Sequence, residues 1–322
     1  MSINRRRLVV LLFVAVCTLF ATLYFFQVRN KAPSAKLTFG ILGTALIDGL
    51  SIVAAEQDPW KDNGLTVDVR RFSSGRETAE ALIGGHVDVA TFAELPFVLA
   101  SVRDPSLRII RVLNDARSLG IVVNRTKKID HPVDLKGRSI GVSVGTTGNL
   151  ALISYLQKNG ITSKDIRVIN LGPAELLAAF INGDVDAICT WQPFVQFALQ
   201  RSPDGALLSG SQDHLRAMYL LVAREKTILD RREELSRLVA GLDVTQVGFE
   251  QRASDAQLIL GKATGLDLAS LRNIWDLFEF KVRSADVALT ALRDAEKFAA
   301  ASGMLAAGTP LRDWSKHTAN LK

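Results

Sequence analysis

Hydroxyl-bearing residues and glycines gather where a short apolar run gives way to a helical pattern, and this combination suits an oxyanion. They are Gly145, Thr146, Thr147, Gly148 and Asn149. Free N–H groups and hydroxyls at a helix start can hold an anion, and the helix dipole favours its negative charge. Ser73, Ser74 and Gly75 repeat this arrangement before a second helical pattern. Serine and threonine also cap helices where no ligand binds, so both interpretations stay open.

Three other positions bear on the charge and shape of a ligand. Trp191, followed by Gln192, ends an apolar run, and its ring would either stack on an organic ligand or a cation, or pack between lobes. Glu94 would repel a simple anion and attract an amine, which favours a zwitterionic or cationic ligand, unless it is an exposed acid at the rim. Arg117 would either complement an anion or lie on the surface.

The residue types that carry covalent or metal chemistry are not arranged for it. The histidines stand apart in the sequence, and no pair has metal-ligand spacing such as HExxH. There is no P-loop and no Cys–His arrangement. Cys189 has no basic neighbour in the sequence, so we expect a buried structural thiol. The sequence therefore predicts no enzyme, no catalytic residue, no metal site and no cofactor.

The elements that must position these residues alternate between strands and helices. Apolar runs such as Leu37–Leu42 and Ser139–Val144 predict buried strands, and Thr147 is expected to cap a helix from Gly148 to Asn159. The alternation is typical of an α/β protein with mostly parallel sheets, in which ligands bind beyond the carboxyl ends of the strands. We therefore expect the ligand-binding residues at that edge of the sheets, together with Arg117, near which the chain would pass from one half of the protein to the other. They are Gly43, Thr44, Ser73, Ser74, Gly75, Thr91, Ala93, Glu94, Arg117, Thr146, Thr147, Gly148, Asn149, Trp191 and Gln192.

The chain also repeats itself. Residues 81–97 read ALIGGHVDVATFAELPF, and residues 179–194 read AFINGDVDAICTWQPF. The matching residues are Gly85, Val87 and Asp88 in the first copy and Gly183, Val185 and Asp186 in the second. Such a repeat predicts two similar α/β lobes, with the chain leaving the first near Arg117–Asn124 and returning near Tyr219–Arg224. Beyond about residue 225 we expect helices over Glu233–Glu250, Ser254–Gly265, Leu268–Phe278 and Ser284–Gly303, and no clear strand.

Three segments resemble the periplasmic solute-binding proteins of ABC importers of the nitrate, sulfonate, taurine and thiamine-precursor type. They read FSSGRETAEALIGGHVDVA (72–90), HPVDLKGRSIGVSVGTTGN (131–149) and INGDVDAICTWQPF (181–194). The resemblance implies a type II periplasmic binding protein fold, with two α/β lobes, two crossover strands and a ligand cleft. The lobes would comprise residues 36–117 with 223–322, and residues 118–222. It also implies a permease and its ATPase as partners on separate chains.

The N-terminus predicts export. The stretch from Leu8 to Phe26 carries no charge, and as a helix it would be about 28 Å long, close to the roughly 30 Å of a bilayer core. Arg5–Arg7 precede it, so residues 1–7 would stay cytoplasmic and residues 8–28 would anchor the chain in the bacterial inner membrane. A cleaved signal and a lipoprotein signal at Cys17 are the alternatives. All three deliver the remainder to the periplasmic side.

Composition agrees with an exported globular protein. The chain has 322 residues, of which 48% are hydrophobic and 22% charged, as in ordinary proteins of about two domains. Its net charge is +6, and Arg5, Arg6, Arg7 and Arg29 supply most of the excess, so there is little support for nucleic-acid binding.

These features together predict a solute-binding component of an ABC importer. It would capture a small anionic or zwitterionic solute, similar to a sulfonate, taurine or nitrate, by closure of two lobes. It would then deliver the solute to the permease. A membrane-anchored sensory binding protein and a thiamine-precursor-related enzyme are the alternatives, and the resemblance favours a monomer.

Overall fold

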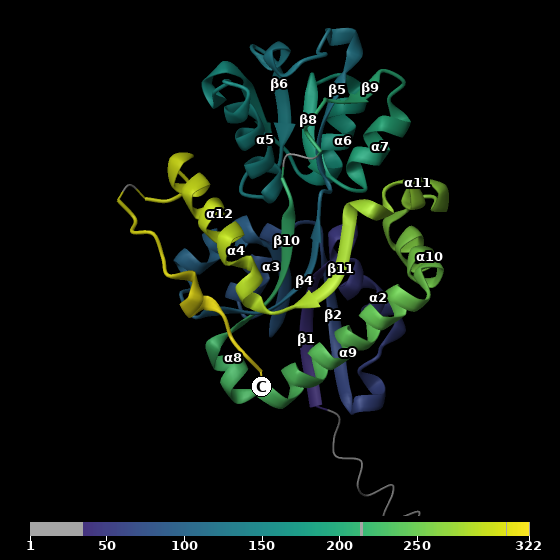
Figure 1. The fold of residues 1–322 in the computed structure, drawn as a ribbon, viewed down its shortest axis with the longest axis vertical. Coiled ribbons are helices and arrows are strands. Elements are labelled where there is room, and N and C mark those ends of the chain that lie inside the picture. Colours follow the sequence, from purple (N-terminus) through teal and green to yellow (C-terminus); the bar gives the residue numbers. More distant parts are fainter. Residues whose placement is uncertain (1–34, 213–214, 307, 322) are drawn as a thin grey trace, which may run out of the picture.

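The computed structural model describes residues 35–212, 215–306 and 308–321. These residues fold into two α/β lobes, one above the other in Figure 1, with a separate sheet in each. The predicted membrane segment, residues 8–28, lies outside this range. Among the described helices, none has both the length and the apolar character that a membrane span requires.

The first lobe is built on a six-stranded sheet with the order β11-β4-β10-β3-β1-β2. β1 pairs in parallel with β2 and β3, whereas β10 and β11 run antiparallel to β4. The expected parallel arrangement is therefore correct for only half of the sheet. β4 leads toward the second lobe and β10 returns from it, so the two must run in opposite directions. The strands are β1 (Ala35–Leu42), β2 (Leu65–Phe72), β3 (Val89–Ala93), β4 (Leu107–Ala116), β10 (Ala217–Arg224) and β11 (Phe278–Arg283).

The second lobe has a five-stranded sheet with the order β7-β6-β8-β5-β9. β6 pairs in parallel with β7 and β8, and β5 runs antiparallel to β8 and β9. The chain crosses between the lobes at residues 117–118 and again after Leu208, so β10 belongs to the first sheet. The strands are β5 (Leu119–Asn124), β6 (Ser139–Val142), β7 (Arg167–Asn170), β8 (Ala187–Trp191) and β9 (Gly205–Leu207).

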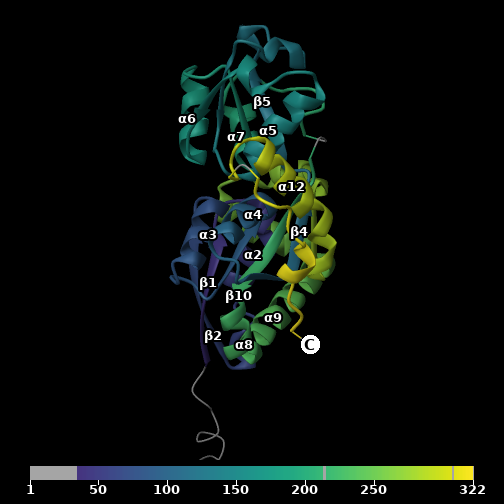
Figure 2. The ribbon, with the colours of Figure 1, turned by 90° about the vertical axis from the view of Figure 1, so that its left-hand side faces the viewer.

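Helices flank both sheets (Figures 1 and 2). In the first lobe α2 packs with α9 and α10, while α3 and α12 pack with α4. The helices of this lobe are α2 (Gly49–Gln57), α3 (Gly75–Ile83), α4 (Glu94–Arg103), α8 (Glu225–Asp230), α9 (Arg232–Gln251), α10 (Ala253–Thr264), α11 (Leu268–Asn273) and α12 (Leu289–Ala301). Those of the second are α5 (Thr147–Lys158), α6 (Pro173–Asn182) and α7 (Phe194–Arg201).

The expectation of no strand beyond residue 225 is wrong. The predicted helix over Leu268–Phe278 ends at Asn273, and β11 forms the edge of the first sheet beside β4. Its apolar residues alternate with charged ones, a period of two that suits a strand with one buried face. Phe280 packs against Phe249 of α9, with ring centroids 4.6 Å apart, so tertiary packing holds this short strand in place.

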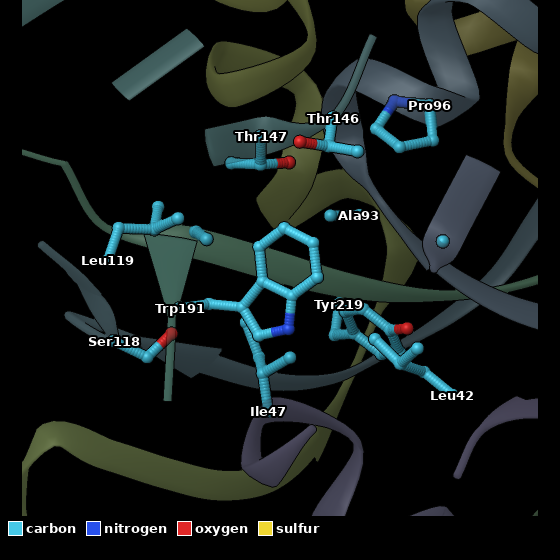
Figure 3. Close-up of a pocket in the computed structure, with 12 residues that line it drawn as sticks. Leu42, Ile47, Ala93, Pro96, Ser118, Leu119, Thr146, Thr147, Trp191 and Tyr219 are labelled. Atoms are coloured by element: carbon cyan, nitrogen blue, oxygen red, sulfur yellow. The ribbon is translucent and has the colours of Figure 1, made fainter. Parts of the chain in front are cut away.

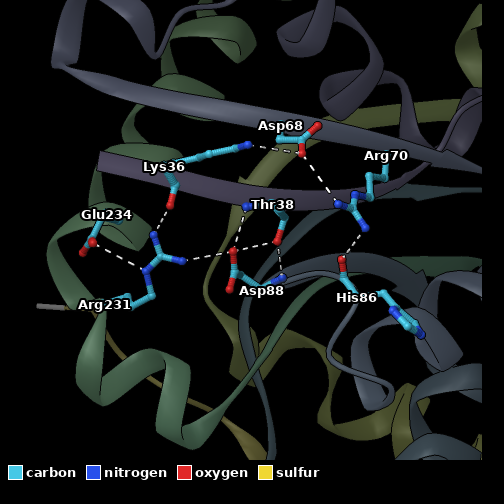
Figure 4. Close-up of polar contacts among 8 residues, drawn as sticks. All are labelled: Lys36, Thr38, Asp68, Arg70, His86, Asp88, Arg231 and Glu234. Atoms are coloured by element: carbon cyan, nitrogen blue, oxygen red, sulfur yellow. Dashed lines mark hydrogen bonds and ion pairs between the residues drawn. The ribbon is translucent and has the colours of Figure 1, made fainter. Parts of the chain in front are cut away.

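The repeat has a structural basis that is the same in both lobes. The Thr38 N–H and hydroxyl donate to Asp88 Oδ2 at 2.7 and 2.6 Å, so Asp88 ties the start of β3 to β1. In the second lobe, the Ser139 N–H and hydroxyl donate to Asp186 Oδ2 at 2.9 and 2.7 Å. Arg231 adds an ion pair to Asp88 at 3.0 Å (Figure 4). Each repeated aspartate thus fixes two neighbouring parallel strands in register.

Candidate functional site

A small cavity of about 40 Å³ lies between the two lobes. Its walls come from both lobes and from the first crossing, so a change in the separation of the lobes changes its volume (Figure 3). None of the residues that line it carries a charge. They are Leu42, Ile47, Gly75, Ala93, Pro96, Ser118, Leu119, Thr146, Thr147, Trp191, Ala217 and Tyr219.

The start of α5 forms the second-lobe wall of this cavity. The N-cap is Thr146, not the expected Thr147, and its hydroxyl donates to the Ser143 carbonyl at 2.7 Å instead of capping the helix. Within the described chain, the N–H groups of Thr147 and Gly148 donate no hydrogen bond. The buried Thr147 hydroxyl also has no partner there. These are free donors at the positive end of a twelve-residue helix, which is the arrangement that attracts an anion.

Trp191 presents a further free donor to the cavity. It ends β8, is buried, and packs edge-on against Phe194 with ring centroids 6.2 Å apart. Its Nε1–H has no hydrogen-bond partner in the described residues. In Figure 3 the indole lies centrally, between the threonines of α5 and Tyr219. The indole therefore both packs in the lobe and offers its N–H to a ligand.

Ser73, Gly43 and Thr44 lie elsewhere. They line a separate surface hollow beside Arg71 and Phe72. The Ser73 N–H and hydroxyl both donate to the Glu77 carboxylate, at 3.1 and 2.8 Å. The two donors of Ser73 that the sequence offered to a ligand are thus already bonded within the chain.

Ser74 and Gly75 begin α3. Ser74 is the N-cap, and its hydroxyl accepts the Glu77 N–H at 3.3 Å. Gly75 lines the cavity. The Ser74 side chain therefore caps the start of α3 without a ligand, although Gly75, the first residue of the helix, lines the cavity.

Ala93 lines the cavity, whereas its neighbours do not. Thr91 is fully buried and donates to Asp48 Oδ2 at 2.6 Å. Glu94 lies in another hollow, between α5 and α12, where it accepts the Met218 N–H at 3.1 Å. Burial raises the pKa of Glu94 to about 7, so it is a buried acid and not an exposed one at the rim.

The remaining predicted residues surround the cavity without lining it. Arg117 is exposed at the crossing and donates its N–H to the Leu277 carbonyl at 2.9 Å. Gln192 is buried, and its side-chain oxygen accepts the Gln196 N–H at 3.2 Å. Gly148 lies against Trp191, where an added Cβ would be 3.6 Å from the indole. Asn149 is buried with an unpartnered side-chain oxygen among the described residues.

The sequence analysis missed seven of the twelve residues that line the cavity. Ser118, Leu119, Ala217 and Tyr219 follow or precede the points where the chain crosses between lobes, a signal that could have identified them. The other missed residues are Leu42, Ile47 and Pro96. Asp48, next to Ile47, is a buried acid beneath this wall, and burial raises its pKa to about 7.

Cys189 is buried behind the start of α5, as expected for a structural thiol. Its Sγ donates to the Gly148 carbonyl at 3.3 Å, and burial raises the pKa of the thiol to about 12. The described residues contain no group of three or more His, Cys, Asp or Glu able to hold a metal ion.

With this geometry in hand, similarity to known proteins identifies the family. The sequence model of the family described as NMT1/THI5 like matches residues 50–248. The chain belongs to this family. The NMT1/THI5-like chain is 28% identical over 196 residues to the taurine-binding periplasmic protein of Escherichia coli (strain K12). That match covers 61% of this chain and 58% of the relative's length.

Solved structures agree with the fold. The alkanesulfonate-binding protein SsuA from Xanthomonas axonopodis pv. citri, bound to MOPS, superposes with a TM-score of 0.78 at 18% identity, over 90% of this chain and 99% of that one. The periplasmic nitrate-binding protein NrtA from Synechocystis PCC 6803 superposes with a TM-score of 0.67 at 15% identity, over 86% and 84%. The NMT1/THI5-like chain therefore has the periplasmic binding protein fold that its sequence predicts.

Proposed function

We propose that this protein is the extracytoplasmic solute-binding component of an ABC importer, and that it captures a small sulfonate- or taurine-like solute between its lobes. The observation that carries the proposal is the group of unpartnered donors at the start of α5, in a buried cavity lined by uncharged residues. Hydrogen bonds from such donors to an anionic oxygen are stronger than neutral ones. The anionic group would lie against Thr147, Gly148 and the Trp191 indole.

The similarity to proteins named for taurine, alkanesulfonates and nitrate supports an oxyanion ligand. Because the cavity is lined from both lobes, closure would enclose the ligand and opening would release it. We further propose that residues 8–28 anchor the protein in the inner membrane, and that the protein releases its solute to a separate permease and its ATPase. It rests on the family and on the N-terminal sequence.

The state of Cys189 supports binding over catalysis. A nucleophilic cysteine acts as its thiolate. Here burial holds the thiol protonated at any ordinary pH, and no Cys189 atom lines the cavity.

Thermal unfolding of the full chain in mild detergent tests the proposal against taurine, ethanesulfonate, nitrate and small amines. A ligand at 100 times its dissociation constant stabilises a protein by about 2.7 kcal/mol. At roughly 2–4 °C per kcal/mol, that is a shift of several degrees. Thr147→Val and Trp191→Phe should reduce the shift, and Thr126→Val, at an exposed threonine of the same lobe, should not. If no sulfonate shifts the unfolding temperature, the proposal is wrong.

A further inference from the structure

A second hollow lies at the junction of the lobes, and we call it the α5–α12 hollow. Its volume is about 520 Å³. It is lined by residues of α5 in the second lobe and of α12 in the first, and these two helices lie near each other in Figures 1 and 2. The described residues that line it are different from those that line the central cavity. The hollow is therefore a separate place where a ligand could contact both lobes.

Most of the wall of this hollow is apolar. Leu150 comes from α5, Phe298 comes from α12, and Leu215 and Met218 come from the segment that returns to the first lobe and from the start of β10. Concave sites with apolar walls and a few polar groups are typical of sites for small organic molecules. These side chains would suit the hydrocarbon part of such a molecule.

Among the described residues, four of this wall are charged. Arg216 pairs with Glu279 of β11 at 2.7 Å. Lys297 lies 3.9 Å from Asp294 of the same helix, and both side chains are about two-thirds exposed. The fourth is Glu94, and no cation of the described chain pairs with it or lowers its pKa. The wall therefore holds one negative charge without a partner.

The Glu94 carboxylate is held at the wall of the hollow by backbone groups. Its Oε2 accepts the Met218 N–H at 3.1 Å, and both residues line the hollow. The N–H of Glu94 itself also donates to the carboxylate. These neutral donors orient the side chain without neutralising its charge. A buried charge without a counter-charge costs folding free energy, so a bound cation would be stabilising.

We propose that the α5–α12 hollow binds a small primary amine with an apolar tail, whose ammonium group pairs with Glu94 and whose tail lies against Leu150 and Phe298. The ammonium group supplies the missing counter-charge, and its hydrogen bonds to a carboxylate are stronger than neutral ones. The tail removes apolar surface of both lobes from water. Because this site is separate from the central cavity, the inference does not depend on the proposed function.

The ammonium group reaches the carboxylate only when a neighbouring side chain moves, since Glu94 is 1% exposed. Met218 is the neighbour suited to this movement. It lies beside Glu94, lines the hollow and is only half-buried. Its side chain is unbranched and changes rotamer easily. The hydrogen bond between the two residues uses the Met218 backbone, so it is retained when the side chain moves.

Titration calorimetry of the full chain in mild detergent tests the inference with n-pentylamine at pH 8. A titration without protein corrects for amine that enters the detergent. Pentanol and pentanoate have the same tail without the positive charge, so both should bind at least about tenfold more weakly. Ethylamine should bind roughly three- to fourfold more weakly for each methylene group that it lacks.

Two variants locate the binding site. Glu94→Gln keeps the shape of the side chain and removes its charge, so it should weaken pentylamine binding about 10- to 100-fold. Asp48→Asn is the matched control, because Asp48 is as deeply buried, has a similarly raised pKa and does not line the hollow. This variant should keep the wild-type affinity for pentylamine within about threefold.

The pH dependence of binding gives an independent measurement. Burial raises the pKa of Glu94 to about 7, so its ionised fraction is about tenfold lower at pH 6 than at pH 8. The wild type and Asp48→Asn should both bind pentylamine about tenfold more weakly at pH 6. Should Glu94→Gln not fold, this change in the wild type decides, and equal affinity at the two pH values overturns the inference.

Three results contradict the inference directly. They are no binding of pentylamine, equal binding of pentylamine and pentanol, and equal affinity of the wild type and Glu94→Gln for pentylamine. Equal affinity for ethylamine and pentylamine would show that the apolar wall takes no part, which also overturns it. None of these titrations contains a sulfonate, so their failure leaves the proposed function to its own test.

Discussion

Two buried acids with raised pKa values, Asp48 and Glu94, should make the stability of this protein fall as pH rises, and Asp48→Asn tests this directly. Burial raises the pKa of Asp48 from 3.8 to about 7. Hydrogen bonds from Ser51, Thr91 and the Leu42 N–H lower this pKa, as does the charge of Arg71, but burial outweighs them. The folded state therefore keeps a proton that the unfolded state has released. Stability is complete below pH about 4 and is lost as pH rises to about 7.

The magnitude follows from the size of this shift. At about 1.4 kcal/mol per pKa unit, the ionised Asp48 costs about 4 kcal/mol of folding free energy above pH 7. Between pH 5 and 7 the wild-type chain should lose roughly 1.4 kcal/mol per pH unit from this one group. The Asp48→Asn variant lacks the titration, so its stability should depend on pH less steeply by that amount. Glu94→Gln should behave in the same way, because burial also raises the pKa of Glu94 to about 7.

Urea unfolding at pH 5, 6, 7 and 8 measures these slopes. Asp88→Asn is the control, because hydrogen bonds from Thr38 and the charge of Arg231 outweigh burial and hold the pKa of Asp88 below its ordinary value. The stability that Asp88 supplies is present above pH about 4 and is lost below it, so this variant should keep the wild-type slope between pH 5 and 7. Equal slopes for the wild type and Asp48→Asn would refute the argument that this carboxyl is buried without a counter-charge.

Three further variants test the packing within and between the lobes. Gly241→Ala in α9 should destabilise the protein by roughly 1–3 kcal/mol, because the new methyl group would overlap the buried Trp60 indole. Gly248→Ala, in the same helix but with open space around the added atom, should be neutral or stabilising in the same chemical denaturation assay. Gln200 of α7 donates to Ser270 Oγ of α11 at 2.6 Å, a bond between lobes. Gln200→Ala should therefore speed ligand dissociation severalfold in stopped-flow measurements, and an unchanged rate would show that this contact does not hold the closed form.

Local patterns in the sequence were sufficient for much of the fold. The start of α6 at Pro173 and the paired roles of Asp88 and Asp186 follow from residues close together in the chain or from the repeat. The first crossing, near residue 117, was also foreseeable, since it lies between the two copies of the repeat. Helix capping, strand burial and repetition depend on short-range order, which one sequence displays.

The identity of the cavity walls depended on contacts between distant segments. Ser73 and Thr147 have similar sequence surroundings, yet Glu77 occupies the donors of Ser73 while those of Thr147 remain free. Tyr219 and Asp48 meet only because β10 returns from the second lobe to lie beside β3. The sheet order that brings them together is set by the burial of apolar strand faces over the whole lobe. No local pattern reports that burial, so the polarity of the site became visible only in the folded chain.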